Sequence, residues 1–238
     1  FISTNIIGTH ILLKASFDFF NKLEESKKDN FKYIQISTDE VYGSLLDSDP
    51  QSSEDSAYFP NSPYSASKAS GDHLVRAWHE TYGLPTITTN CTNNYGPFQH
   101  KEKLIPLLIH NCLENKKLPI YGDGSNIRDW LFVEDHCDAL TVVLEKGING
   151  ETYNIGGKNE IKNIEVVKKV CDLMDELRPK KDGDSYHELI TFVDDRLGHD
   201  YRYGLNISKI EKELNWSPKE NFESGLKKTV EWYLNILE

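Results

Sequence analysis

The stretch QISTDEVYGS, Gln35–Ser44, continues a short apolar run that begins at Tyr33 and predicts the end of a β-strand. Two hydroxyl side chains are followed there by adjacent carboxylates, Asp39 and Glu40. One interpretation is a polar strand-to-helix turn in which Asp39 caps a helix. The other is an acid and a base held at the end of a strand, where open α/β sheets bind their ligands. These residues alone leave both interpretations open.

Helical and strand patterns alternate along the rest of the chain. Apolar side chains at helical spacing predict a helix over residues 5–23, and the β-branched stretch 84–91 predicts a strand. The other expected helices are one that contains Pro63 and ends near Gly83, then 103–116, the second part of 128–147, 163–178, 206–215 and 221–238. The other expected strands are 118–122, the first part of 128–147, 151–157 and 189–193.

This alternation predicts the fold class and the domain organisation. Strands that alternate with helices imply an α/β fold, a parallel sheet with helices on its faces. The chain of 238 residues is long enough for one large or two small domains with a substantial core. From about Leu104 onward, the segments suggest a smaller α/β cap interleaved with the main sheet.

The composition narrows the classes of partner. The net charge of −11 argues against a nucleic-acid partner, although a few local arginines suffice to hold a small anionic substrate. No apolar run approaches the roughly 18 residues of a membrane span, and no signal peptide is visible, so no membrane partner is expected.

The four cysteines are widely spaced, which argues against both a zinc site and a disulfide framework. Each is expected to be a small buried side chain. We therefore expect no bound metal, and a reducing cytoplasm fits this pattern.

Tyr64 and Lys68 form a Y-x-x-x-K pair inside a predicted helix. Four residues are about one helical turn, so both side chains share a face. A neighbouring ammonium stabilises a phenolate and would lower the pKa of Tyr64 from about 10, which would make it a base for an alcohol. The alternative for Tyr64 is a half-buried aromatic residue of the helix.

Thr38 lies 26 residues before Tyr64, the order found in the short-chain dehydrogenase/reductase superfamily. Six blocks strengthen this resemblance: STDEVYG, PYSASKASGDHLVRAW, NNYGPFQHKEKLIPL, LPIYGDGSNIRDWLFVEDH, ETYNIGG and DRLGHDYRY. Together they resemble the dTDP-glucose 4,6-dehydratases, extended members of that superfamily, from Phe1 almost to the C-terminus. The resemblance implies a Rossmann-like sheet, NAD as cofactor, dTDP-glucose as substrate and a homodimer.

The resemblance also implies a role for the acid pair, which relatives that only epimerise C4 lack. Tyr64 would deprotonate the glucose 4-hydroxyl while Thr38 hydrogen-bonds it, and hydride would leave C4 for NAD⁺. Glu40 would then remove the C5 proton, and a protonated Asp39 would give its proton to the departing C6 hydroxyl. Hydride would finally return to C6. The residues implied beside NAD are Ser37, Tyr64 and Lys68.

Later blocks resemble the nucleotide-sugar contacts of the same family. Without the resemblance, Arg128 beside Asp129 would be interpreted as a surface ion pair, and His199 as an ordinary surface histidine. The resemblance implies substrate contacts from Thr38, Asn93, Lys103, Leu104, Pro119, Tyr121, Arg128, Asn163, Arg196 and His199, of which Pro119 and Tyr121 would form a wall for the thymine.

One departure from the family pattern concerns the cofactor. These dehydratases begin with a strand, a glycine-rich turn and a helix that bind the NAD pyrophosphate, yet no G-x-x-G-x-x-G is present in the chain. We therefore expect roughly a hundred residues, about a βαβαβ half, to be missing from the sequence. Residues 1–103, with 128–155 interleaved, would be the remainder of the NAD-binding domain, and 104–238 mainly a nucleotide-sugar-binding domain.

Two other functions remain open for the chain. One is another NAD-dependent nucleotide-sugar dehydratase, decarboxylase or epimerase of the same superfamily, although UDP-glucuronate decarboxylases and GDP-mannose dehydratases usually carry a small residue at the position of Asp39. The other is a non-catalytic remnant that binds nucleotide sugars without its cofactor half.

Two predicted helices carry more apolar surface than one sheet requires. Ile7, Ile11 and Phe19 mark one face of the first helix, Ile6, Leu13, Phe17 and Phe20 mark others, and the helix of Tyr64 carries Leu74, Val75, Trp78 and Tyr82. A surface helix packed against one sheet needs a single stripe. We expect the surplus to pack against a second subunit in a four-helix interface.

Overall fold

The predicted strand before the acid pair is β1 (Tyr33–Thr38), and it pairs in parallel with β2 (Thr86–Cys91), which pairs in parallel with β6 (Thr152–Ile155). The computed structural model describes residues 1–237. In the register of the sheet, Thr38 lies opposite Cys91, and Cys91 opposite Ile155. The carboxyl ends of the three strands therefore meet at one edge, the place where parallel sheets bind ligands.

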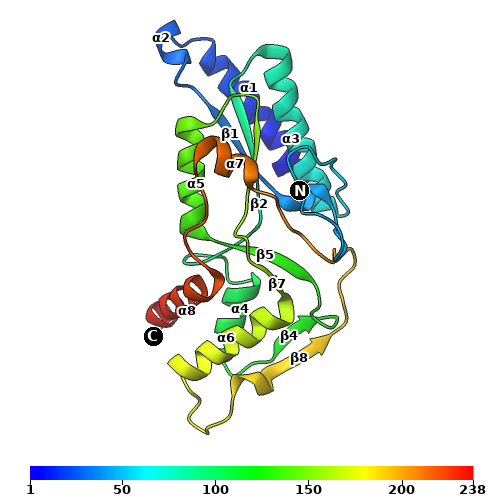
Figure 1. The fold of residues 1–238 in the computed structure, drawn as a ribbon, viewed down its shortest axis with the longest axis vertical. Coiled ribbons are helices and arrows are strands. Elements are labelled where there is room, and N and C mark those ends of the chain that lie inside the picture. The colour runs from blue at the N-terminus through cyan, green and yellow to red at the C-terminus, as the bar shows by residue number, and fades with distance from the viewer. Residues whose placement is uncertain (238) are drawn as a thin grey trace.

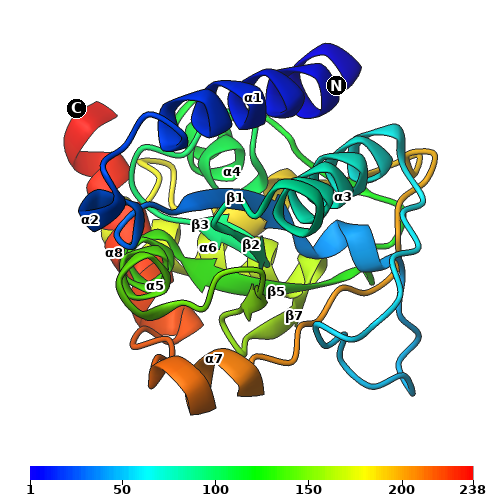
Figure 2. The same ribbon diagram turned by 90° about the horizontal axis from the view of Figure 1, so that it is seen from above.

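Helices cover both faces of this sheet (Figures 1 and 2). On one face lie α1 (Thr9–Phe20), which continues the π-helical turn η1 (Ile2–Gly8), and α3 (Pro63–Tyr82). On the other lie α5 (Val133–Lys146) and α7 (Ser208–Leu214). The sheet and helices share a core that includes Val41, Ile87, Leu131, Val143, Ile155 and Trp216.

The limits of α3 reflect its sequence. The Ser62 hydroxyl accepts a hydrogen bond from the Ser65 N–H, and Pro63 occupies the first turn, where its missing N–H costs nothing. The helix ends at Gly83, whose φ of 66° lies in the left-handed region that glycine adopts without a steric penalty. These caps place Tyr64 in the first turn, close to the end of the strand that precedes the acid pair.

A second layered unit lies below the first sheet. It contains β3 (Asn93–Tyr95), β5 (Ile127–Phe132) and β7 (Glu160–Lys162) in one sheet, and β4 (Leu118–Tyr121) with β8 (Ile190–Val193) in another. The helices α4 (Leu104–Leu113), α6 (Asn163–Leu177) and α8 (Phe222–Leu237) pack on these strands; the short elements α2 (Glu25–Lys28), η2 (Asp39–Tyr42) and η3 (Tyr186–Leu189) complete the chain. The core of the second unit includes Tyr95, Ile109, Trp130, Val170, Phe222 and Val230.

The prediction of an α/β fold with parallel strands is confirmed. The expectation of one main parallel sheet was too simple, because β5 and β7 are antiparallel and the strands form three small sheets. β3 and β7 were not predicted, since three residues are too few for a periodic pattern. The first helix is divided by a change from π-helical to α-helical geometry. The last was predicted to reach Glu238, which lies outside the described residues.

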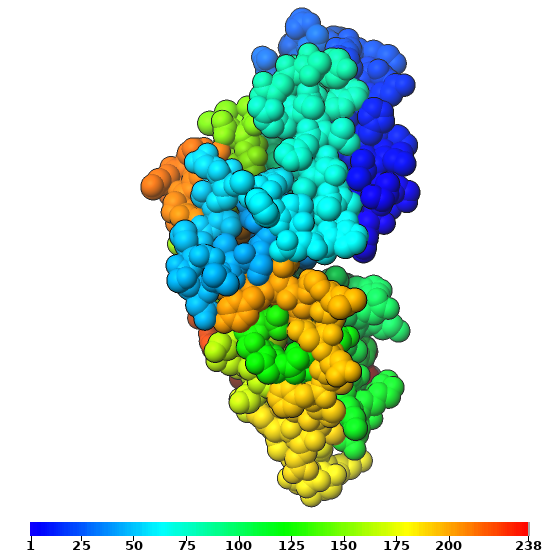
Figure 3. Space-filling view, turned by 90° about the vertical axis from the view of Figure 1, so that its right-hand side faces the viewer, coloured from blue at the N-terminus to red at the C-terminus, as the bar shows by residue number. Residues whose placement is uncertain are grey.

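The surface view shows where the two units meet. Figure 3 shows the N-terminal residues, blue to cyan, stacked on the green and gold segments, with an indentation between them. None of the helices within residues 1–237 is long and apolar enough to cross a membrane. Cys112 and Cys171 are buried as expected. Cys91 is only partly buried and Cys137 is exposed, so the expectation was wrong for Cys137.

Candidate active site

The acid pair lies in a short 3-10 turn, η2, directly after β1. The residue that caps this turn is Thr38, whose hydroxyl accepts a hydrogen bond from the Glu40 N–H at 3.3 Å. The turn ends at Gly43 with a φ of 84°, and a Cβ there would lie 2.4 Å from the Phe59 carbonyl oxygen. Thr38 therefore caps this turn, and the carboxyl group of Asp39 is not needed as a cap.

Burial and neighbouring charges separate the two acids. Asp39 is 4% exposed, and burial together with the Glu40 charge raises its pKa to about 8. Its Oδ1 accepts the Thr38 hydroxyl at 3.2 Å, while Oδ2 accepts no hydrogen bond from any described residue. At neutral pH this carboxyl therefore carries a proton that it can donate.

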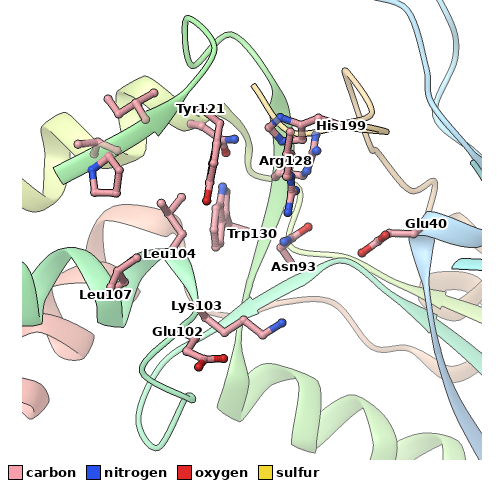
Figure 4. A pocket seen from close by; sticks show the side chains of 15 residues that line it. Glu40, Asn93, Glu102, Lys103, Leu104, Leu107, Tyr121, Arg128, Trp130 and His199 are labelled. Carbon is pink, nitrogen blue, oxygen red and sulfur yellow. The ribbon is translucent and has the colours of Figure 1, made fainter. Parts of the chain in front are cut away.

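Glu40 lies in a different electrostatic environment. Burial raises its pKa, but the cations Arg128, Arg196 and Lys103 oppose that shift. Its side chain also lines a cavity and points toward Asn93 (Figure 4). The pair thus combines an acid that is protonated at neutral pH with a second carboxyl group whose ionised form is favoured by nearby cations, the division of roles that elimination requires.

Tyr64 and Lys68 share a face of α3, as predicted, but their electrostatics differ from the prediction. Burial raises the pKa of Tyr64 to about 12, with further contributions from Glu40 and other nearby groups. The Lys68 Nζ donates a hydrogen bond to the Ile36 carbonyl at 2.6 Å. The expected lowering of the pKa of Tyr64 by Lys68 was therefore wrong for the chain alone, because burial and surrounding carboxylates dominate.

The side chain of Ser37 faces away from the cavity. Its hydroxyl donates a hydrogen bond to the Asp72 carboxylate at 2.5 Å, and the residue is 3% exposed. The Ser37 side chain is therefore buried, one residue before Thr38 in the chain. Its predicted place beside NAD stays a prediction.

A cavity of about 370 Å³ lies between the end of β1 and the second unit (Figure 4). It brings together all the predicted substrate residues except Thr38. These are Asn93, Lys103, Leu104, Pro119, Tyr121, Arg128, Asn163, Arg196 and His199, and Glu40 joins them from the acid pair. Residues spread over more than half of the chain therefore face one space.

Arg128 is a buried cation in this cavity, with 5% of its surface exposed. Its guanidinium donates hydrogen bonds to the carbonyls of Ile127 and Asp200 at 2.7 and 2.8 Å, and lies 4.4 Å from the centre of the Tyr203 ring. The alternative of a surface ion pair was wrong, because the Asp129 carboxylate instead accepts backbone N–H groups. Neutral carbonyls hold the arginine in place and leave its charge available for an anion.

A loop after β8 supplies further polar groups. The His199 Nδ1 lies 2.7 Å from an Asp195 oxygen, and the ring stands edge-on to Tyr121 at 6.5 Å. Burial, Arg196 and Arg128 lower the pKa of His199, which favours a neutral imidazole. The Arg196 guanidinium lies 6.0 Å from the centre of the Tyr121 ring. A neutral hydrogen-bonding ring, an aromatic wall and two arginines suit a phosphorylated organic molecule.

Sequence reasoning missed part of the cavity wall. Trp130 stands two residues after Arg128 on β5, so both side chains lie on the same face of the strand, and this spacing was a usable signal. Leu107 lies one turn after Lys103 and could have been found in the same way. The other missed wall residues are Glu102, Ile120 and Val167.

The residues at the carboxyl edge of the first sheet fit one half of a nicotinamide cofactor. Tyr64 and Lys68 are half-buried there, and a phenol and an ammonium are donors that suit ribose hydroxyls and amide oxygens. The glycine-rich turn for the pyrophosphate is not in the sequence given. The fit therefore concerns the nicotinamide side alone.

Comparisons with known proteins show the family of the chain. A model of the family described as GDP-mannose 4,6 dehydratase matches residues 1–229. The dTDP-glucose 4,6-dehydratase of Shigella flexneri is 59% identical over an alignment of 242 positions, which includes 98% of this chain. The chain spans 66% of the length of that relative.

Two solved structures of dTDP-glucose 4,6-dehydratases have the same fold. The one from Bacillus anthracis, in complex with NAD, has a TM-score of 0.86 and 48% identity, covering 99% of this chain and 69% of its own. The one from Streptomyces venezuelae, also with NAD bound, has a TM-score of 0.87 and 42% identity, covering 99% and 67%. The chain therefore belongs to the GDP-mannose 4,6 dehydratase family, and the relatives that it resembles at this level of identity are dTDP-glucose 4,6-dehydratases.

Proposed function

We propose that the protein to which this chain belongs is an NAD-dependent lyase that dehydrates dTDP-glucose to dTDP-4-keto-6-deoxyglucose. The observation that carries the proposal is the acid pair beside the cavity. Asp39 is protonated at neutral pH because its pKa is about 8, while cations favour the ionised form of Glu40. Elimination of water needs one proton donor and one proton acceptor at neighbouring carbons, and this pair supplies both.

Each residue of the proposed site has a defined task. Tyr64 accepts the proton of the C4 hydroxyl, which Thr38 orients by a hydrogen bond. Glu40 removes the C5 proton, made acidic by the ketone at C4, and Asp39 protonates the C6 hydroxyl as it leaves. When bound, NAD would supply hydride transfer between C4 and C6 of the sugar, and Glu40 would return its proton to C5 as C6 gains the hydride. Tyr64 and Lys68 would hold its nicotinamide side.

The cavity explains how a nucleotide sugar would be oriented. Arg128, Arg196 and Lys103 bring three cations to its wall, enough to bind a diphosphate. Pro119 and Tyr121 offer a flat apolar surface for a base. The sugar then extends toward Glu40, which enters the cavity from the other unit.

The proposed reaction is tested by incubating the full-length protein and NAD with dTDP-glucose and following the nucleotide sugar by nuclear magnetic resonance. We expect a 4-keto group and a C6 methyl group to form. GDP-mannose and UDP-glucuronate serve as the comparison substrates, since they separate the alternative dehydratase and decarboxylase activities. Turnover of either one in preference to dTDP-glucose, or binding without any turnover, would contradict the proposal.

The proposal also assigns the two units and a compartment. The first sheet, with residues 1–103 and the interleaved 128–155, would be the remainder of an NAD-binding domain, and most of 104–238 would bind the nucleotide sugar. The hydrophobic cores follow this division only in part, because Leu205 and Trp216 pack in the core of the first sheet, whereas Tyr95 and Trp130 pack in the core of the second unit. The four cysteines are free thiols, the state that a reducing cytoplasm maintains.

We also propose a homodimer formed by the outer faces of α1 and α3. Leu13 and Val75 are buried within the chain, whereas Ile7, Ile11 and Phe19 are each more than half exposed on the first helix. The substitution Ile11→Asp is expected to convert a dimer into monomers, because an aspartate would be desolvated in the interface. Sedimentation of this variant would be compared with that of Ile148→Asp, which changes an exposed isoleucine in the loop between α5 and β6. A monomeric unmodified protein at micromolar concentration would contradict the proposal.

A further inference from the structure

The proposed mechanism leaves one buried carboxylate of the catalytic helix without a role. Asp72 lies on α3, one turn after Lys68 and two turns after Tyr64, and is 5% exposed. It is not part of the cavity wall. A buried charge is costly unless something in the protein compensates it, so its surroundings indicate what it does.

The contacts of Asp72 lead back to the strand of the acid pair. Its Oδ2 accepts the Ser37 hydroxyl at 2.5 Å and the Tyr58 hydroxyl at 3.4 Å, and its Oδ1 accepts no hydrogen bond from residues 1–237. The Lys68 Nζ binds the carbonyl of Ile36, the residue before Ser37. Two successive residues of β1 are thus bonded to two successive turns of α3.

These two bonds matter because the catalytic residues lie next to them in the chain. Ser37 immediately precedes Thr38 and the acid pair, and the two bonded turns of α3 come directly after the turn that carries Tyr64. The two bonds therefore fix the position of the acid pair, at the end of β1, relative to Tyr64 on α3. A shift between strand and helix would separate the C4 chemistry from the C5 and C6 chemistry, and misplacement of about 1 Å can cost about 10²-fold in rate.

Asp72 also affects the charge around Tyr64. It faces Lys68 on its own helix, Ser37 and Gln35 on β1, and Tyr58 from the preceding loop. Burial raises the pKa of Asp72 to about 6, so the group is mostly ionised at neutral pH. Glu40, Cys91, Asp39 and Asp72 all raise the pKa of Tyr64. Removal of the Asp72 charge should therefore lower the pKa of Tyr64.

We propose that Asp72 is a positioning residue for oxidation at C4, which holds the end of β1 against α3 and places a negative charge beside the Tyr64–Lys68 pair. The proposal rests on the proposed function for its kinetic consequences. It does not require contact between Asp72 and substrate, so it predicts an effect on kcat without a matching effect on KM.

Three variants of the full-length protein separate the two parts of this role. Asp72→Asn removes the charge and weakens the bond to Ser37, and should lower kcat by about 10²-fold with little change in KM. The limb of its pH–rate profile that reports Tyr64 should move to lower pH. Ser37→Ala removes the bond but keeps the charge, so kcat should fall while that limb stays in place. Ser70→Ala, whose hydroxyl bonds only within α3, is the matched control and should behave as the unmodified protein.

A second measurement does not depend on turnover. Isotope-labelled tyrosine allows the Tyr64 phenol to be titrated by nuclear magnetic resonance without substrate or cofactor, and Tyr64→Phe identifies its signal. We expect the Tyr64 phenol of Asp72→Asn to titrate at lower pH than that of the unmodified protein. This readout tests Asp72 even if dTDP-glucose is not the substrate, whereas a failure of the proposed function shows as no turnover by the unmodified protein.

The results that overturn the proposal are equally defined. An active unmodified protein together with an Asp72→Asn variant of equal kcat, equal pH profile and equal Tyr64 titration would overturn it. Circular dichroism establishes whether each variant folds. If Asp72→Asn does not fold, Ser37→Ala decides, and an unchanged kcat in that variant would reject the positioning role.

Discussion

Replacement of Tyr64 by phenylalanine is expected to abolish oxidation of dTDP-glucose at C4, with a loss of about 10²–10⁴-fold or more in rate, because no base remains for the C4 hydroxyl. Binding of the nucleotide sugar should persist, since Tyr64 does not line the cavity that would hold the nucleotide. Neither the 4-keto-6-deoxy product nor any 4-keto intermediate should form. Nuclear magnetic resonance of the reaction mixture and calorimetric binding of dTDP-glucose give the two measurements.

The matched control for this variant is Tyr82→Phe, which removes an exposed phenol from the far end of the same helix. It should retain the activity of the unmodified protein. If Tyr64→Phe still oxidised C4 at the normal rate, Tyr64 would be only a half-buried aromatic residue of α3. Loss of binding together with loss of rate would instead indicate a structural defect.

Replacement of either Asp39 or Glu40 should slow the loss of water without slowing the oxidation at C4. Asp39→Asn has no carboxylic proton to give, and Glu40→Gln cannot accept the C5 proton, so each should slow water loss by about 10²–10⁴-fold. The first oxidation needs Tyr64 and is expected to survive in both variants. A 4-ketoglucose nucleotide should therefore accumulate, and rapid mixing with dTDP-glucose would detect it.

Deuterated water distinguishes the roles of the two acids. In Asp39→Asn, Glu40 is still present, so the C5 proton of the accumulated ketone should exchange with solvent deuterium. In Glu40→Gln that exchange should stop. Normal rates of product formation in both variants would mean that the acid pair is only a polar turn capped by Thr38.

The pH dependence of water loss is set by the same pair. The pKa of Asp39 is raised to about 8, so the donor is present below that value and is lost as the pH rises through it. Water loss should therefore fall above about pH 8, and this limb should be absent from the slow reaction of Asp39→Asn. If the rate of Asp39→Asn fell equally above about pH 8, the ionisation would belong to another group.

Local patterns in the sequence predicted most helices and strands for a physical reason. Periodic apolar residues, Pro63 near the helix start and Gly83 at its end act over one or two turns, so they are readable without the fold. The three-residue strands β3 and β7 form only because neighbouring segments provide partners for their backbone groups. The division into three sheets likewise depends on long-range pairing.

Some residues of the candidate site could likewise be predicted from local sequence, whereas others are brought together only by the fold. The Tyr64–Lys68 spacing and the position of Asp39 and Glu40 after a strand could be read directly from the chain. The substrate residues were reached only through the family resemblance, because nothing local connects Asn93 with His199. The structure joins them by packing β4, β5 and the loop after β8 around one cavity.

The sequence by itself determined which ionisable groups lie near the strand end and which share a helical face, since both depend on spacing along the backbone. Only the tertiary structure decided which of them carry protons. The pKa of Asp39 rises because folding buries it next to Glu40. Burial also raises the pKa of Glu40, but Arg128 and Arg196, which are remote in sequence, oppose that rise. The pKa of Tyr64 likewise rises because burial outweighs the lysine one turn away. Desolvation and charge interactions act through space, and neither is set until the chain has folded.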